Sequence, residues 1–209
     1  MKKSWEQMSG WIEELHAPLG NLMGQLELRQ EEMEPECYGL LWRDCQNLRS
    51  YMERLLRLIQ VYAGDVPPCW GRSPLRDCVE EAAHSVEKEA QEKGILLRVE
   101  YDRGDRNIWS DAKLLREILE QLIRYTLTRS ASGECVTAGC TAYRDTVALW
   151  VENPSEHIIE ARAAMECRGE STLRLEVCRG LAAQLGAVLF CGNGEHGGVR
   201  RGITLPVAS

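Results

Sequence analysis

The sequence Glu13-Glu14-Leu15-His16-Ala17-Pro18-Leu19 places a charged, proline-containing box inside a regular apolar heptad. The heptad alternates steps of three and four residues, through Trp5, Met8, Ile12, Leu15, Leu19, Leu22 and Leu26. This spacing predicts a helix with one apolar seam that packs against other helices. A proline inside a helix removes a backbone hydrogen bond and destabilises the helix by about 3 kcal/mol. The box at 13–19 therefore needs a reason other than packing.

A second apolar seam follows the first and predicts a second long helix. It runs through Leu41, Cys45, Leu48, Met52, Leu55, Ile59 and Tyr62. Between the seams lies the polar segment 31–36, in which Pro35 is well placed near the start of the second helix. Two helices joined by a short polar turn form an antiparallel hairpin. One hairpin does not cover two apolar stripes, so we expect a homodimer that forms a four-helix bundle. The alternative is that the hairpin packs on the rest of its own chain.

The composition of the chain limits its class. Its 209 residues fit one large domain or two small ones, and 44% of them are apolar, which is enough for a core. A net charge of -7 argues against general nucleic-acid binding. No apolar run approaches the ~18 residues that a membrane span needs, and the first residues do not follow a signal-peptide pattern. We therefore expect a cytoplasmic protein without a membrane span that binds no nucleic acid.

Two patterns in the sequence imitate metal or cofactor sites. The chain has nine cysteines but no Cys-x-x-Cys pair. Cys135 and Cys140 lie five residues apart in a predicted strand, so they face opposite sides and share no metal. We interpret the cysteines as buried free thiols and expect no metal site. Segment 192–197 matches Gly-x-Gly-x-x-Gly, but it precedes a strand instead of opening a helix, so it predicts a hairpin loop.

The second part of the chain alternates helices and strands. Segment 64–71 is rich in proline and glycine and predicts a linker. The helices are predicted at 73–93, 111–129 and 172–185, with Ser73 and Pro74 opening the first and Ser110-Asp111 capping the second. The strands are predicted at 95–101, 135–143, 146–152, 187–191 and 201–207. Helices with a mostly antiparallel sheet form an α+β layer.

The order of elements, the box at 13–19 and segments 73–79, 92–95 and 108–115 resemble the core of bacterial sensor histidine kinases. Histidine phosphotransferases built on the same plan are similar as well. The resemblance covers nearly the whole chain. It implies a dimerisation and histidine-phosphotransfer hairpin at 1–63, a linker at 64–71, and a domain at 72–209 like the ATP-binding domain of histidine kinases and Hsp90. The implied fold class is α+β: a helical hairpin, which is a four-helix bundle when dimeric, followed by an α/β sandwich of the histidine kinase ATPase type.

The resemblance gives the residues of the box specific positions. The family usually has His-Glu-Leu-Arg-Thr-Pro-Leu here, so Glu13 stands at the phosphoacceptor position. A carboxylate is not the imidazole nucleophile that forms a phosphoramidate. His16 lies about 4.5 Å along the helix and roughly 60° round from Glu13, which makes it either a displaced phosphoacceptor or an ordinary surface histidine. The resemblance also implies that a response-regulator receiver domain docks beside Glu13, Glu14, His16 and Pro18.

The resemblance also identifies remnants of a nucleotide site. Gln121 and Tyr125 stand where the family has asparagines that help hold Mg²⁺ and phosphates. Gln121 still offers an amide oxygen, whereas tyrosine is a poor ligand for Mg²⁺. Asn153 stands at the position of the adenine-reading aspartate, and Ser155 and His157 replace glycines of the same motif.

The lid segment departs from the family pattern in the same way. After Gly169, Thr172 and Arg174 replace glycines that let backbone N–H groups approach phosphates. Gly202 belongs to the closing strand, 201–206, whose match to the family is structural. We therefore expect no cofactor, with Mg²⁺–ATP binding at these remnants as the alternative.

These replacements leave three functional hypotheses open. The first is a degenerate histidine-kinase-like dimer, a pseudokinase of a two-component system, that binds a response regulator or a partner histidine kinase as an adaptor. The second is an active histidine kinase or a phosphorelay histidine phosphotransferase that uses His16. The third is a non-catalytic nucleotide-binding regulator in which Gln121 and Asn153 hold the nucleotide.

Overall fold

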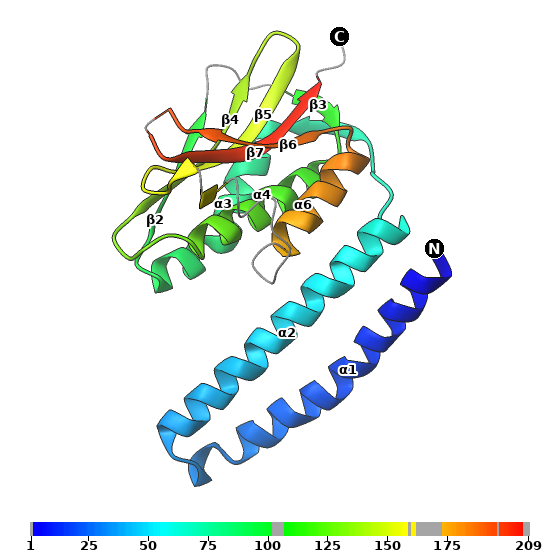
Figure 1. Ribbon diagram of the computed structural model, residues 1–209, viewed down its shortest axis with the longest axis vertical. Coiled ribbons are helices and arrows are strands. Elements are labelled where there is room, and N and C mark those ends of the chain that lie inside the picture. Colours follow the sequence, from blue (N-terminus) through cyan, green and yellow to red (C-terminus); the bar gives the residue numbers. More distant parts are fainter. Residues whose placement is uncertain (1, 102–106, 159, 162–172, 196, 207–209) are drawn as a thin grey trace. The chain divides into compact units, whose positions relative to one another are not determined.

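The computed structural model describes residues 2–101, 107–158, 160–161, 173–195 and 197–206. The chain divides into two compact units, Met1–Val66 and Pro67–Ser209, each with its own core (Figure 1). The first unit is helical and the second combines helices with a sheet. The α+β fold class predicted from the sequence is therefore confirmed.

The first unit is a hairpin of two long helices. Helix α1 spans Lys2–Leu28 and helix α2 spans Pro35–Ala63, with the short 3-10 turn η1 (Gln30–Glu32) between them. Pro35 is the first residue of α2, where its missing N–H leaves no hydrogen bond unmade. Gly64 ends α2 with a φ of 80°, a left-handed conformation that glycine adopts without strain.

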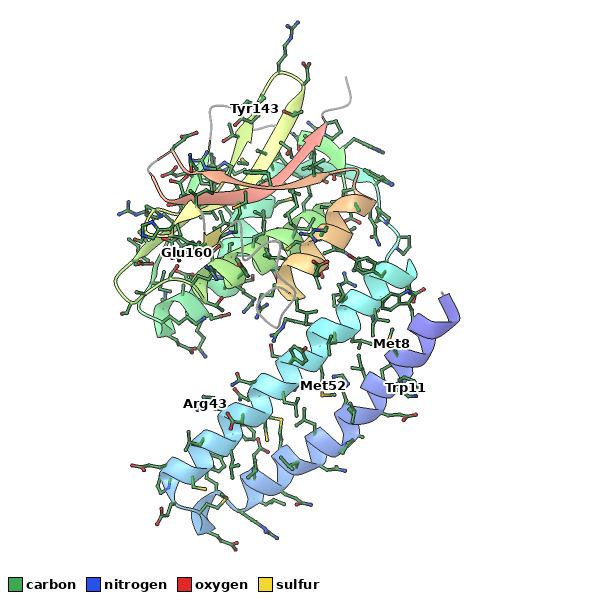
Figure 2. The ribbon with its side chains drawn as sticks, viewed as in Figure 1. Met8, Trp11, Arg43, Met52, Tyr143 and Glu160 are labelled. Carbon is green, nitrogen blue, oxygen red and sulfur yellow. The ribbon has the colours of Figure 1, made fainter. Side chains whose placement is uncertain are left out.

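Only part of each predicted seam is buried within one hairpin. Leu19 and Met23 of α1 form a buried cluster with Cys45 and Met52 of α2, and Figure 2 shows Met52 between the two helices. Ile12, Leu26 and Trp42 pack against this cluster. Four other seam residues are exposed: Leu15 by 54%, Leu22 by 49%, Leu41 by 41% and Leu48 by 51%. One hairpin therefore leaves much of its apolar surface uncovered, as the two seams predicted.

The second unit is a five-stranded sheet with helices on one face (Figure 1). The strand order is β2-β4-β5-β7-β6, in which the pair β2–β4 is parallel and the other pairs are antiparallel. The strands are β2 (Leu96–Tyr101), β4 (Cys135–Ala142), β5 (Thr146–Asn153), β6 (Val188–Asn193) and β7 (Val199–Pro206). The helices are α3 (Leu75–Glu92), α4 (Ala112–Leu127) and α6 (Leu173–Gln184).

The core of this unit lies between α4 and the middle of the sheet. Leu115, Ile118, Leu119, Leu122 and Ile123 of α4 are fully buried. Strand β5 is buried from its second residue to its last. Within the described part of the chain, no helix is long and apolar enough to cross a membrane.

A two-stranded ribbon was missed by the sequence analysis. Strand β1 (Gly71–Pro74) pairs antiparallel with β3 (Asn107–Ser110). The helix predicted to open at Ser73 and Pro74 is present, but α3 begins at Leu75 with Pro74 as its N-cap, and Ser73 belongs to β1. The Ser73 hydroxyl donates to the Ser110 carbonyl oxygen at 3.1 Å instead of capping α3. The predicted cap of α4 is confirmed, since the Asp111 side chain accepts hydrogen bonds from two N–H groups of the first turn.

Gly202 lies in the middle of the sheet, paired with Trp150 of β5 and Phe190 of β6. A Cβ atom here would clash with the Leu149 carbonyl oxygen and come 2.8 Å from the Cα of Trp150. The glycine therefore serves the close packing of β7 on β5.

Gly202→Ala should destabilise the second unit by about 1–3 kcal/mol, because rigid backbone atoms leave no room for the methyl group. Urea unfolding followed by circular dichroism measures the change. Gly192→Ala in β6 is the matched control, since a Cβ there meets nothing within 4 Å. Equal stability of the two variants would contradict the steric argument.

Candidate functional site

The box lies on an uninterrupted part of α1, with Pro18 inside the helix. The Glu13 and Pro18 side chains are exposed, His16 is half-buried, and Leu19 is buried in the hairpin core. Glu13 Oε1 accepts a hydrogen bond of 3.5 Å from Ser9 Oγ, one turn earlier. The box thus presents Glu13 at the surface, while Leu19, less than two turns later, anchors the helix in the core.

The four predicted docking residues do not share one face of α1. A helix turns about 100° per residue, which places His16 about 60° and Glu13 about 120° to one side of Leu19. Pro18 and Glu14 fall about 100° and 140° to the other side by the same geometry. Glu13 and His16 therefore form one surface, and Glu14 and Pro18 belong to another.

The protonation pattern of the His16 ring follows from one contact. His16 Nδ1 lies 3.1 Å from the carbonyl oxygen of Ile12. A carbonyl oxygen only accepts hydrogen bonds, so Nδ1 must carry the proton. In the neutral ring the lone pair then belongs to Nε2, which is the nitrogen that can act as a nucleophile.

Five of the exposed apolar residues of the hairpin gather on one side. Trp11, Leu15 and Leu22 lie about 40–80° from Leu19, in the rotational sense opposite to His16. Leu41 and Leu48 lie about 40–60° from Cys45 in that same sense. Antiparallel helices are related by a two-fold axis perpendicular to both. Residues displaced in the same rotational sense about each helix axis, viewed from that helix's own N-terminus, therefore lie on the same side of the hairpin. We call these five residues, Trp11, Leu15, Leu22, Leu41 and Leu48, the apolar flank.

In the second unit, the amide oxygen that Gln121 offers at the family's Mg²⁺ position is already engaged. Gln121 Oε1 on α4 accepts a hydrogen bond of 2.7 Å from Arg174 Nη1 on α6. Arg174 is one of the residues that replace the glycines of the lid. Gly169 and Thr172, the other predicted lid residues, lie outside the described residues.

Asn153, at the end of β5, is engaged at both ends of its amide. Its Nδ2 donates to Ser130 Oγ at 2.9 Å and lies 3.4 Å from Glu134 Oε2. Its Oδ1 accepts the Ser155 N–H at 2.8 Å. Asn153 is 1% exposed, so its side chain is part of the core of this unit.

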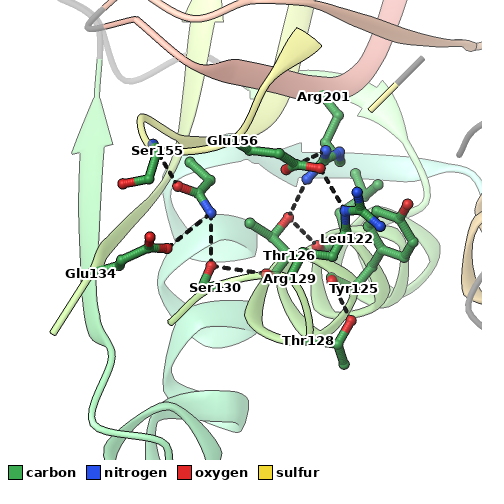
Figure 3. A network of polar contacts seen from close by, with 11 residues as sticks. Leu122, Tyr125, Thr126, Thr128, Arg129, Ser130, Glu134, Ser155, Glu156 and Arg201 are labelled. Atoms are coloured by element: carbon green, nitrogen blue, oxygen red, sulfur yellow. Dashed lines mark hydrogen bonds and ion pairs between the residues drawn. The ribbon is translucent and has the colours of Figure 1, made fainter. Parts of the chain in front are cut away.

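Beside Asn153 lies a buried ionic network that joins α4, β7 and the turn after β5. Figure 3 shows Glu156 between two arginines: Arg201 Nη2 and Arg129 Nε each lie 2.6 Å from one of its carboxylate oxygens. Arg201 also donates to Thr126 Oγ1 at 3.1 Å. The Arg201 guanidinium lies 5.0 Å from the centroid of the Tyr125 ring, and both side chains are fully buried. We call Tyr125, Thr126, Arg129, Glu156 and Arg201 the Arg201 network.

No family model and no curated protein matches the sequence. Solved structures match over most of its length. Full-length ShkA in complex with AMPPNP has a TM-score of 0.77 and 19% identity over 98% of this chain. The Acinetobacter baumannii histidine kinase AdeS has a TM-score of 0.63 and 14% identity, covering 93% of this chain and 96% of its own. Histidine kinase ThkA in complex with the response regulator TrrA has a TM-score of 0.66 and 16% identity over 97% of this chain.

The chain has the fold of a histidine kinase core. It spans 46% of the ShkA chain and 61% of the ThkA chain. At sequence identities of 14–19%, structural similarity establishes the fold but not the activity. The activity depends on the residues of this chain.

Most residues of the Arg201 network were not predicted from the sequence. Tyr125 was singled out, but Arg129, Glu156 and Arg201 were not. One signal was available: Val199, Arg201, Ile203 and Leu205 alternate along β7, which puts a charge on an otherwise apolar face. A charge on such a face is rarely buried without a partner.

The structure also tests the predictions made for the glycine-rich segment and for the cysteines. The Gly-x-Gly-x-x-Gly segment is a β6–β7 hairpin loop, closed by a 3.2 Å hydrogen bond from the Gly194 N–H to the Gly198 carbonyl oxygen, so that prediction is confirmed. The prediction of buried thiols is wrong for Cys37 and Cys69, which are exposed. Cys45, Cys78 and Cys178 are buried as expected.

Tyr125 provides a test of the network through pH. Burial raises the pKa of its phenol, although the neighbouring Arg129 and Arg201 oppose the rise. The folded state thus holds the phenol proton more tightly than the unfolded state, whose pKa is about 10. The stabilisation is complete below pH ~10 and is lost as the pH rises through the pKa of the folded state.

We expect the unfolding free energy of Tyr125→Phe to fall less steeply above pH 10 than that of the wild type, by up to about 1.4 kcal/mol per pH unit. Near pH 7 the variant should be as stable as the wild type, because the phenol oxygen has no hydrogen-bond partner among the described residues. Urea unfolding between pH 7 and 11 gives both results. Identical alkaline slopes would show that Tyr125 is solvated.

Proposed function

We propose that the chain is a dimeric, non-catalytic member of a two-component system that binds a response-regulator receiver domain or a partner histidine kinase as an adaptor. The observation that carries this proposal is the division of the hairpin into two surfaces. The apolar flank lies on one side, and Glu13 with His16 lies on the other. One side is thus suited to dimerisation while the other stays open to a partner.

The apolar flank supports the dimer. Its five large side chains are 41–63% exposed in the single chain. Soluble monomers rarely expose a contiguous patch of this kind. Pairing the flank with its two-fold copy buries it within a four-helix bundle, in which each residue meets the same surface of the other hairpin. A partner kinase with the same hairpin would cover the flank equally well.

The surface of Glu13 and His16 supports docking without phosphotransfer. ThkA, which shares this fold, has been solved in complex with the response regulator TrrA. By analogy, we assign receiver-domain binding to the Glu13 side of α1. The exposed carboxylate preserves a polar contact there, but it cannot take the role of an imidazole that carries a phosphoryl group.

One observation favours a second candidate function, phosphotransfer through His16. The hydrogen bond from Nδ1 to the Ile12 carbonyl oxygen fixes the tautomer whose lone pair is on Nε2. A histidine phosphotransferase needs such a nitrogen on the docking surface. His16 meets this requirement although it is three residues away from the usual position.

The dimer can be tested with one charge on the apolar flank. The wild type should have twice the 23.6 kDa mass of the chain by light scattering, and Leu48→Glu should be monomeric because a buried carboxylate would be unpaired. Leu40→Glu is the matched control: Leu40 is 52% exposed, against 51% for Leu48, but lies about 80° further round α2. A monomeric wild type, or a dimeric Leu48→Glu variant, would contradict the proposed interface.

Docking can be tested with a panel of purified receiver domains from the same organism, measured by surface plasmon resonance. At least one should bind the wild type, and Glu13→Arg should weaken binding about tenfold or more, a loss of about 1.4 kcal/mol. Glu14→Arg makes the same change in charge on the other surface of α1 and should bind like the wild type. Equal effects of the two variants would rule out docking on the Glu13 side.

The two candidate functions separate in a phosphotransfer assay. Incubation with phosphorylated receiver domains should leave the wild type unlabelled if the adaptor proposal is correct. Label on the wild type that is absent from His16→Gln would instead establish His16 as the phosphoacceptor. The label should then be lost in acid and retained in alkali, as expected for a phosphoramidate.

A further inference from the structure

The histidine kinase core fold implies Mg²⁺ and ATP as ligands of the second unit, and ShkA was solved with AMPPNP. The residues that would meet these ligands all lie in the second unit. Whether they fit Mg²⁺ and ATP does not depend on the docking function proposed for the hairpin.

The two residues at the family's Mg²⁺ positions, Gln121 and Tyr125, are not suited to bind Mg²⁺. The ion requires compact oxygen ligands in octahedral geometry. The one such oxygen predicted here, Gln121 Oε1, accepts a 2.7 Å hydrogen bond from the Arg174 guanidinium. Arginine is always protonated and would repel a divalent cation beside it. Tyr125, at the other metal position, is fully buried and kept neutral by its environment.

The base position does not fit adenine. Recognition of a base needs a polar group that a ligand can reach. Asn153 is 1% exposed, and both ends of its amide are used by Ser130 and Ser155. A base could bind there only after these hydrogen bonds had been broken.

The Arg201 network occupies the neighbouring space with fixed charges of its own. The Glu156 side chain is 5% exposed and the Arg201 side chain 0%, and Arg201 Nη2 lies 2.6 Å from Glu156 Oε2. Arg129 contacts the other Glu156 oxygen at 2.6 Å. Separating these groups to admit a ligand would leave a buried charge without its partner, which is strongly unfavourable. Opening the network would therefore be costly.

We infer that the second unit binds no Mg²⁺–nucleotide, and that Arg174 and the Arg201 network are built-in substitutes that hold it closed without a ligand. Arg174 supplies a positive charge at the metal position. The ion pair of Arg201 and Glu156 joins β7 to the turn after β5, and the Arg201–Thr126 hydrogen bond joins both to α4. The unit would thus be a rigid scaffold whose state is independent of nucleotide.

Hydrogen–deuterium exchange of the full chain tests this inference. Without nucleotide, amides of residues 122–129 and 150–156 should exchange as slowly as global unfolding allows, and 5 mM ATP with Mg²⁺ should leave them unchanged. Isothermal titration under the same conditions should show no saturable heat. Fast local exchange that nucleotide slows, or saturable binding of ATP or ADP, would overturn the inference.

A pair of variants shows whether the network maintains the closed state. Glu156→Gln should speed exchange in both segments at least tenfold, because it removes the charge that both arginines face. Glu195→Gln is the matched control. It makes the same change in an ion pair outside the network, between Glu195 Oε1 and Arg200 Nη1 at 3.0 Å, and the Glu195 side chain is 69% exposed. Equal exchange in the two variants would refute the role of the network. The wild-type measurement decides the question of nucleotide even if Glu156→Gln does not fold.

Discussion

The ion pair between Arg201 and Glu156 constrains how β7, the turn after β5 and α4 meet. Arg201 is the largest of its fully buried side chains, and its guanidinium meets the Glu156 carboxylate, the Thr126 hydroxyl and the face of Tyr125. These contacts connect β7, the turn after β5 and α4. Burying two charges is costly, and loss of one partner costs about 3–5 kcal/mol because the other is left uncompensated. The pair thus restricts this part of the unit to one arrangement.

Much of the fold could be predicted because it follows from local periodicity. The steps of three and four through Leu19 and Met52 indicated α1 and α2, and the strands predicted at 135–143 and 146–152 correspond to β4 and β5. The ribbon of β1 and β3 could not be predicted in this way. Its strands have four residues each, too few for an alternating pattern, and their pairing joins positions 33 to 39 residues apart.

The candidate site was only partly predictable, for a related reason. The resemblance gave the positions of Gln121, Tyr125 and Asn153, but not what their side chains contact. Arg174 lies 53 residues from Gln121, and Arg201 lies 45 from Glu156. Pairings over such distances in sequence are created by the fold. The sequence indicated that family residues had been replaced, and the structure shows what the replacements contact.

The apolar flank has a consequence for the cell. With the proposed dimer, folding of the hairpin is linked to association, so each tenfold rise in concentration adds about 1.4 kcal/mol to the stability of the assembly. A flank made mainly of leucines also distinguishes poorly between a second copy and another hairpin of similar shape. The proportion of mixed dimers would then follow the relative abundance of the two proteins. Gene dosage, rather than a chemical signal, would set how much of a partner is captured.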